Sequence, residues 1–505
     1  MVTPPEPAPS GLKEVITTRQ FTLMALGSSI GAGLLLSTGQ ALAVGGPAPV
    51  LIAFAVIGFA VWITMCNLGE LSANFPVKGS FYEYSVRFIS PSWGFAMGWN
   101  YVMNFVFVVP FEIIVMVMCA RYWNPDVSAY LLVPIFICGL AVIYLFGARW
   151  YAEAENVFGI LKILVLAIFV ATAFCILARI VPTDTRPAAE LAYHSWRTEA
   201  FKNGIQGSFF VFMSAGMAYG GTEMLGLTAA ECRFPRRVME MASKLVACRI
   251  MLLYLLPVLT LGLVLKIDPL PADADGGTAT KELISPFVLA VAQASIPVLP
   301  GLMNAIIVVA IFSMANASVF AASRALHAIS SRGMGPSFCT FMYRDRPIGA
   351  LVVVFAFSLL AFAKASRHGD EIFVWLLALA SCSNYLTWSS ICVAQIRCRL
   401  AHRRQGKAYG IRGAYQSPFG IGGSALAVII FIFGLTAQIA AAAKSPLIMP
   451  PPPPAASGFI GLLVVAFFWG GYMVYKRDTT LFVPLRMIEL GRKERMFANA
   501  ESLPI

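Results

Sequence analysis

The sequence predicts an all-α integral membrane protein, and three observations support this prediction. The chain of 505 residues is 58% hydrophobic and has a mean hydropathy of +0.76. Only 12% of its residues are charged, whereas soluble globular proteins usually contain about 25%. Apolar runs of roughly 20 residues, the length of a membrane-spanning helix, recur along the chain. These observations exclude an ordinary soluble fold.

Twelve apolar runs are long enough to cross a bilayer, and short polar connections separate them. The runs lie at about 21–44, 49–71, 93–121, 129–148, 156–180, 204–229, 247–267, 297–325, 348–364, 371–396, 419–442 and 457–475. We predict a tail, a first group of five spans, a second group of five spans, two further spans and a second tail. The corresponding boundaries are 1–20, 21–180, 204–396, 419–475 and 476–505.

The distribution of the 37 Lys and Arg residues predicts how these spans are oriented. With the N-terminus in the cytoplasm, the cytoplasmic segments contain 26 of these cations and the outer loops contain 10. Cytoplasmic loops of membrane proteins have an excess of Lys and Arg, so both termini are predicted to be cytoplasmic. The formal net charge of +12 then reflects orientation and contact with anionic membrane lipids, and nucleic-acid binding has no support.

The sequence patterns argue against an enzyme, a cofactor and a metal site. The ten cysteines lack metal-ligand spacing, and the four histidines are scattered without an HExxH cluster. The sequence contains no GxxxxGK[ST] nucleotide-binding loop and no convincing Ser/His/Asp or Cys/His arrangement. We therefore expect neither covalent catalysis nor a bound cofactor or metal ion.

Two spans have glycine-rich centres that predict broken helices. The stretch GSSIGAG lies at 27–33 in the first run, and AGMAYGG lies at 215–221 in the sixth. Irregular backbone inside a membrane survives only where protein or a filled cavity satisfies its amides and carbonyls. Interrupted spans in corresponding positions, with five spans per repeat, predict an inverted-repeat transporter with its substrate between the breaks. Close helix packing is the alternative explanation for Gly27-xxx-Gly31 taken alone.

Ionisable residues inside the predicted spans are further functional candidates. Glu112 follows Pro110 in the third run, and Lys162 lies roughly two turns inside the fifth. A cation at the centre of a membrane helix costs about 2.5–3.5 kcal/mol on insertion scales, so such residues are functional by default. Snorkelling of Lys162 toward the membrane edge is the structural alternative.

Several longer motifs show a family resemblance. They are GSSIGAGLLLSTGQALAVGGP, LGELSANFPVKGSFYEYSVRFISPSWGFAMGWNY, GGTEMLGLTAAECRFPRR, ISPFVLAV, ANASVFAASRALHAISSRG and WSSICVAQIRCRLAHRRQGK. With these motifs the chain resembles the fungal amino acid permease family, within the amino acid/polyamine/organocation superfamily, over nearly its whole length. The resemblance implies twelve transmembrane helices in the LeuT-type fold, with an inverted 5+5 repeat, discontinuous helices 1 and 6, and two additional C-terminal helices.

The resemblance also implies proton-coupled amino acid uptake by alternating access, and the chemistry of the breaks suits a zwitterion. Amides freed at the first break would stabilise the substrate carboxylate, and carbonyls freed near 214–217 would accept from its ammonium group. The family usually has Thr at position 32 and Gly at position 29, so Ser29 is a candidate substitute for the missing hydroxyl of Ala32. The predicted substrate-binding residues are Ser29, Gly31, Ala32, Gly33, Met217, Ala218, Tyr219, Gly220 and Glu223.

Individual roles follow from the same resemblance. Lys162 matches the lysine that relatives place where sodium-driven cousins bind a sodium ion, and it would bond to carbonyls of the first break when charged and release them when neutral. We assign proton coupling to Lys162 and Glu112, with Glu223 either as a second relay or as a ligand for the substrate amine. Tyr219, where the family commonly has Phe, would act as a gate, and a packing aromatic is the alternative.

Other functions stay open on the sequence alone. One is an amino-acid-sensing receptor with little flux, although the short tails do not favour it. Another is an exchanger, or a carrier of a different amine such as choline or a polyamine. The resemblance implies the plasma membrane, with the vacuolar membrane as the alternative. The identity of the amino acid and the oligomeric state are not constrained by the sequence.

Overall fold

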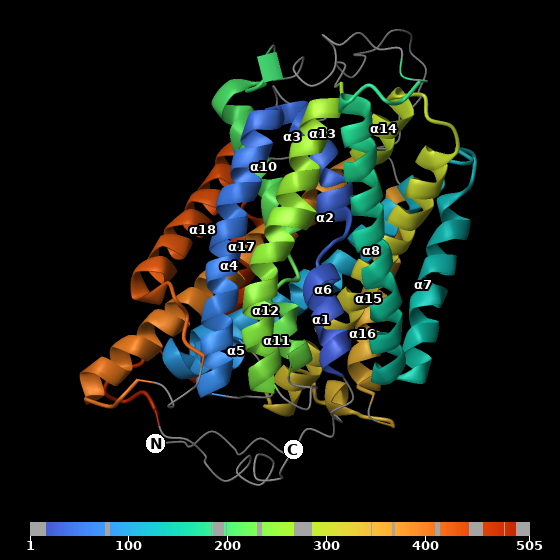
Figure 1. The fold of residues 1–505 in the computed structure, drawn as a ribbon. Helices are drawn as coiled ribbons and strands as arrows, with labels where there is room; N and C mark the ends of the chain where they lie inside the picture. Colours follow the sequence, from blue (N-terminus) through green and yellow to red (C-terminus); the bar gives the residue numbers. More distant parts are fainter. Residues whose placement is uncertain are drawn as a thin grey trace, which may run out of the picture.

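The protein is a bundle of helices in the computed structural model, and Figure 1 shows their arrangement. The structure describes residues 17–75, 81–182, 184, 196–197, 199–229, 235–266, 285–344, 346–365, 369–409, 415–443, 458–478 and 480–490. The predicted tails at 1–20 and 476–505 therefore lie largely outside the described residues.

The helices follow one another with short connections in most of the described chain. In order they are α1 (Thr18–Gly27), α2 (Ala32–Leu35), α3 (Ser37–Gly45), α4 (Pro47–Asn74), α5 (Phe81–Phe88), α6 (Pro91–Ala120), α7 (Ala129–Phe146), α8 (Ala148–Leu177), α10 (Gly204–Ala218), α11 (Met224–Ala229), α12 (Pro235–Arg249), the π-helical turn η2 (Ile250–Leu255), α13 (Leu256–Val264), α14 (Pro286–Gln293), α15 (Leu299–Ser331), the 3-10 turn η3 (Ser337–Thr340), α16 (Ile348–Ser358), the 3-10 helix η4 (Leu359–Ala365), α17 (Gly369–Gln405), α18 (Gly420–Ala443) and α19 (Ile460–Lys476).

The membrane-protein class predicted from composition is confirmed. Among the described residues, eight helices are long and apolar enough to cross a membrane, and a bent pair in the first predicted span makes a ninth. Three shorter apolar helices, Gly204–Ala218, Ile348–Ala363 and Ile460–Lys476, fall in the remaining predicted runs. The total of twelve spans stays a prediction.

Both predicted helix breaks are present. In the first span α1 ends at Gly27 and α2 begins at Ala32, and Figure 1 shows the two pieces stacked end to end with irregular chain between them. A further bend of 51° separates the helix ending at Leu35 from α3. In the sixth span α10 ends at Ala218 and α11 begins at Met224. The discontinuous helices thus lie where the glycine-rich stretches predicted them.

Glycines at the first break allow close approach of neighbouring backbones. A Cβ built on Gly27 would lie 3.0 Å from the Cα of Gly159 on α8. A Cβ on Gly33 would lie 2.8 Å from the Cα of Ala218, at the end of α10. Any larger residue at Gly33 would collide with main chain that cannot move aside cheaply. Helix packing and helix breaking are therefore both properties of this stretch.

The bundle has a central helix and a lipid-facing edge. In α6, 89% of an 18-residue apolar stretch is buried, and α6 packs along α15. In α7 only 22% is buried, and its large side chains Tyr130, Leu131 and Leu145 are exposed. Figure 1 shows α7 at the side of the bundle. The apolar surface of α7 suits contact with lipid, whereas α6 lies among protein neighbours.

A buried carboxylate fastens α4 to α17 and to the segment before α18. Glu70 is fully buried and accepts hydrogen bonds from Gln395 Nε2 at 2.9 Å and from Arg399 Nε at 2.9 Å. It also accepts from the backbone amide of Ser417 at 2.6 Å and from the hydroxyl of Tyr409. A second contact with Arg399, through Nη2, completes a bidentate ion pair. Such multiple hydrogen bonding is what makes a buried charge tolerable.

We expect Glu70→Ala to be strongly destabilising. Removing one partner of a buried pair leaves the other charge uncompensated, at a cost of about 3–5 kcal/mol. Thermal unfolding of the purified protein in detergent measures the effect. The matched control is Glu240→Ala, which removes the exposed Glu240–Lys244 pair on α12 and should change little. Equal shifts for the two variants would contradict the structural role of Glu70.

Candidate functional site

Lys162 on α8 contacts the carbonyl end of α1. Its Nζ donates to the backbone oxygen of Gly27 at 3.0 Å, and the side chain is fully buried. Gly159, one turn earlier on α8, touches Gly27 and so brings the two helices close enough for this bond. A cation is favourable at a helix C-terminus because the carbonyl dipoles point toward it. The predicted contact is present, and Lys162 does not snorkel to the edge of the bundle.

Glu112 on α6 contacts the other side of the first break. Its Oε2 accepts from the backbone amide of Ala32 at 3.2 Å, and the side chain is fully buried. Its Oε1 has no hydrogen-bond partner among the described residues. The amide predicted to bind a substrate carboxylate therefore already holds a carboxylate of the protein. The sequence alone did not predict this pairing.

The neighbours of Ser29 and Gly31 complete the first break. The Oγ of Ser29 lies 2.9 Å from the hydroxyl of Tyr254, so the proposed substitute hydroxyl has a protein partner in this conformation. A Cβ on Gly31 would lie 2.6 Å from Cγ of Met314 and 3.0 Å from Oε1 of Glu112. Glycine at this position therefore leaves room for the Glu112 carboxylate beside the main chain.

The carbonyls of the second break also have partners in this conformation. The oxygen of Gly216 accepts from Asn384 Nδ2 at 3.1 Å, and the oxygen of Ala218 accepts from the Tyr254 hydroxyl at 3.1 Å. The oxygen of Met217 accepts from the amide of Gly220 at 3.0 Å. A substrate ammonium group at these oxygens would have to share them with these donors or replace one of the donors.

Tyr219 lies between the two broken spans and α4. It is fully buried, its hydroxyl donates to the backbone oxygen of Phe54 at 2.9 Å, and its ring stacks on Tyr254 with centroids 4.5 Å apart. The hydroxyl thus has the partner that a buried tyrosine requires. These contacts favour a packing role in this conformation, and a role as a gate stays a prediction.

Glu223 is the acidic residue of the second break. It is fully buried, and its Oε2 accepts from Nε1 of Trp388 on α17 at 2.9 Å. Its Oε1 lacks a partner among the described residues. An unpartnered buried carboxylate oxygen is costly, so it favours either a bound proton or a donor from another molecule.

Two charged residues near the breaks were not predicted. Glu155 on α8 accepts from Ser313 Oγ at 3.0 Å and from Asn316 Nδ2 at 2.8 Å, both on α15. Its position seven residues before Lys162 puts both side chains on one helix face, which is a signal that the sequence contained. Arg249 at the end of α12 is also fully buried. The only sequence feature that could have predicted this burial is its position at the edge of an apolar run.

The charges around the breaks do not balance. Near the breaks, and apart from Glu70 with its own partner Arg399, the buried carboxylates are Glu112, Glu155 and Glu223, and the buried cations are Lys162 and Arg249. Buried charges require opposite charges or hydrogen bonds, because water no longer solvates them. One carboxylate is in excess within this described group, so binding of one proton would make the group neutral.

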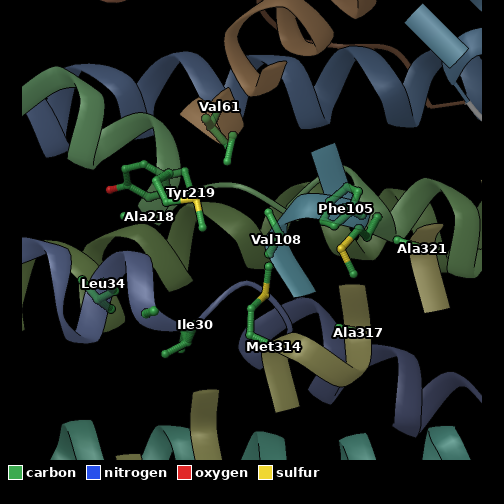
Figure 2. Close-up of a cluster of buried hydrophobic side chains, with 14 of the residues drawn as sticks. Ile30, Leu34, Val61, Phe105, Val108, Ala218, Tyr219, Met314, Ala317 and Ala321 are labelled. Carbon is green, nitrogen blue, oxygen red and sulfur yellow. The ribbon is translucent and has the colours of Figure 1, made fainter. Parts of the chain in front are cut away.

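Apolar side chains occupy the space beside the breaks. Figure 2 shows them converging from the first break, α4, α6, the end of α10 and α15. The labelled members are Ile30, Leu34, Val61, Phe105, Val108, Ala218, Tyr219, Met314, Ala317 and Ala321. These buried side chains fill the space beside the breaks in this conformation.

Two discontinuous helices in contact, with buried charged side chains of α6 and α8 at the first break, are the features of the LeuT-type fold. The structure of MhsT in complex with L-phenylalanine has the same fold. It matches with a TM-score of 0.56 at 14% sequence identity, covering 85% of this chain and 100% of that one. This likeness confirms the predicted broken-helix fold.

The family is shown by sequence comparison. The family described as "Amino acid permease" matches residues 20–484. "Cationic amino acid transporter 1" of Schizosaccharomyces pombe is 34% identical over 477 residues, which cover 93% of this chain and 80% of that protein. "Amino-acid permease GAP5" of Candida albicans is 32% identical over 490 residues, covering 96% and 78%. This chain belongs to the amino acid permease family, a family of multi-pass membrane proteins whose membership supports amino acid transport.

Proposed function

We propose that the protein is a proton-coupled amino acid importer that works by alternating access. The substrate binds mid-membrane between spans one and six, with its carboxylate at Gly31, Ala32 and Gly33 and its ammonium group at the carbonyls of the second break. Spans three, eight and ten line the rest of the site. Both termini are cytoplasmic, and the protein acts at the plasma membrane.

The bond between Glu112 and Ala32 is the observation on which this proposal depends most. The Ala32 amide already holds one carboxylate, 3.2 Å away, so its position suits a second carboxylate of the same chemistry. A substrate carboxylate can take this amide only when Glu112 leaves it. Protonation of Glu112 removes the charge that holds it there, so proton binding and substrate binding favour each other.

The charge imbalance around the breaks supports the same coupling. With three buried carboxylates and two buried cations, the group is neutral after it has bound one proton. Burying a neutral group away from water costs less free energy than burying a charged one, so the proton is expected to bind before the site closes. Within one transport cycle, the substrate-loaded state and the empty state then differ by one proton.

A radiolabelled uptake panel across the amino acids, in vesicles with and without a proton gradient, tests this function. We expect concentrative uptake of at least one amino acid, which a protonophore abolishes. Uptake that does not depend on the proton gradient would indicate an exchanger instead. Binding without uptake would indicate a receptor, and uptake of choline in place of amino acids would contradict the carboxylate site.

A further inference from the structure

Span seven contains a π-helical turn beside both breaks. The turn η2 lies between α12 and α13, and the amide of Leu256 donates to the oxygen of Met251, five residues earlier. Pro257 follows directly, and proline both lacks an N–H and clashes with the carbonyl four residues earlier in an α-helix. A wider turn before Pro257 relieves that clash. Single π turns within helices occur frequently at functional sites.

The turn determines which side chains of span seven share a face. At 3.6 residues per turn, residues five apart in an α-helix point about 140° away from each other. In a π turn the hydrogen bonds join residues five apart, so these residues lie nearly above one another. Arg249 and Tyr254 are five residues apart across η2. Both side chains reach the broken spans, whereas in a continuous α-helix they would point in widely different directions.

Arg249 links the first half-helix to the second break. Its Nη1 donates to the backbone oxygen of Ala25 at 3.0 Å, in the last turn of α1. Its Nη2 donates to Oγ1 of Thr222 at 2.6 Å, between α10 and α11. The guanidinium is fully buried and bridges two acceptors that belong to different spans. An ammonium group has no planar fork and cannot reproduce this geometry.

Tyr254 makes the corresponding link one turn further along. Its hydroxyl lies 2.9 Å from Oγ of Ser29, 3.2 Å from the oxygen of Ser29 and 3.1 Å from the oxygen of Ala218. The hydroxyl has one hydrogen, so it donates to one carbonyl at a time and accepts from the serine. Its ring also stacks on Tyr219. Span seven therefore contacts both breaks at two positions along its axis, through Arg249 and through Tyr254.

We propose that Arg249 and Tyr254 are positioning residues that set the spacing between the two breaks for substrate binding. This inference rests on the proposed transport function. It also assigns different roles to the two cations at the carbonyl end of α1. Arg249 at Ala25 stays charged throughout and is a constant anchor, because arginine does not lose its proton in proteins. Lys162 at Gly27 is the anchor that deprotonation can release.

Transport kinetics of three variants test the positioning role. Tyr254→Phe keeps the stacked ring and removes the hydroxyl, Thr222→Val removes one acceptor of Arg249, and Arg249→Lys keeps the charge without the bridge. We expect each to raise KM about tenfold, the effect of one lost buried hydrogen bond, with little change in maximal rate. The matched control is Leu252→Ala, because Leu252 lies in the same turn but is 54% exposed.

Unchanged KM values in all three variants of a wild type that does transport would overturn the inference and leave the proposed function intact. So would an equal rise in KM for Leu252→Ala. A double-mutant cycle with Ser29→Ala and Tyr254→Phe, measured by thermal unfolding without substrate, tests the contact itself. Non-additive shifts support the link and additive shifts refute it, even if the wild type accumulates no amino acid and the transport proposal fails.

Discussion

Glu112→Gln is expected to abolish proton-driven accumulation while leaving exchange of internal for external substrate. The glutamine oxygen can still accept from the Ala32 amide, so the first break keeps its partner. Glutamine cannot take up or release a proton, so the step that joins protonation to substrate entry is lost. A difference of one pH unit supplies about 1.4 kcal/mol per proton, which is tenfold accumulation. The variant should fall from about tenfold accumulation to simple equilibration.

The measurement is labelled uptake into vesicles under an imposed pH gradient, beside counterflow exchange without a gradient. The comparison variant is Glu223→Gln, because Glu223 is equally buried but bonds to Trp388 and not to the first break. Loss of accumulation in that variant as well would make Glu223 part of the relay. Full accumulation by Glu112→Gln would refute the coupling role of Glu112.

The same substitution should change how substrate affinity depends on pH. In the proposed mechanism, protonation of Glu112 frees the Ala32 amide of the wild type, so KM is expected to fall as the outer pH falls. In Glu112→Gln the side chain is neutral at every pH, so this dependence should disappear. A KM measured across a pH series with the membrane potential clamped shows the difference. An identical slope in both proteins would separate Glu112 from substrate entry.

The features that depended on local sequence were predictable, and the two breaks are the clearest case. Glycines at 27–33 and 215–221 weaken a helix wherever it packs, so their effect does not require knowledge of the tertiary fold. The contact of Lys162 with the first break was predicted from the family resemblance and is present at Gly27. These features account for the fold class and for one charged contact at the first break.

The features that depended on packing between distant segments were not predictable in the same way. Glu112 reaches Ala32 across 80 positions of sequence, and this depends on the tilt and rotation of α6. The hydrophobic periodicity of the sequence does not determine this tilt and rotation. The freed amides of the first break were expected to hold the substrate carboxylate, and the Ala32 amide does hold a carboxylate, but that carboxylate belongs to Glu112. The π turn at η2 had a visible cause in Pro257, yet a proline alone also predicts a kink or a helix end.

Lys162→Ala is expected to abolish uptake driven by a pH gradient while leaving part of the substrate binding. The substitution removes the cation at the oxygen of Gly27 and leaves the buried Glu155 without the positive charge two turns along α8. The main chain predicted to hold the substrate stays, because Arg249 still contacts Ala25 in α1. Accumulation under a gradient and equilibrium binding, measured on one preparation, separate these effects. Undiminished accumulation would refute the coupling role of Lys162.

Lys162→Arg distinguishes release of the proton from the mere presence of a charge. Arginine keeps its proton under all conditions in proteins, so it would hold the carbonyl end of α1 permanently. If release from Gly27 is a step of the cycle, the arginine variant should bind substrate and still fail to accumulate it, as the alanine variant does. If arginine supports accumulation as well as lysine, the charge serves only to balance Glu155 and Glu112. Lys244→Ala, at an exposed position on α12, controls for loss of a lysine as such.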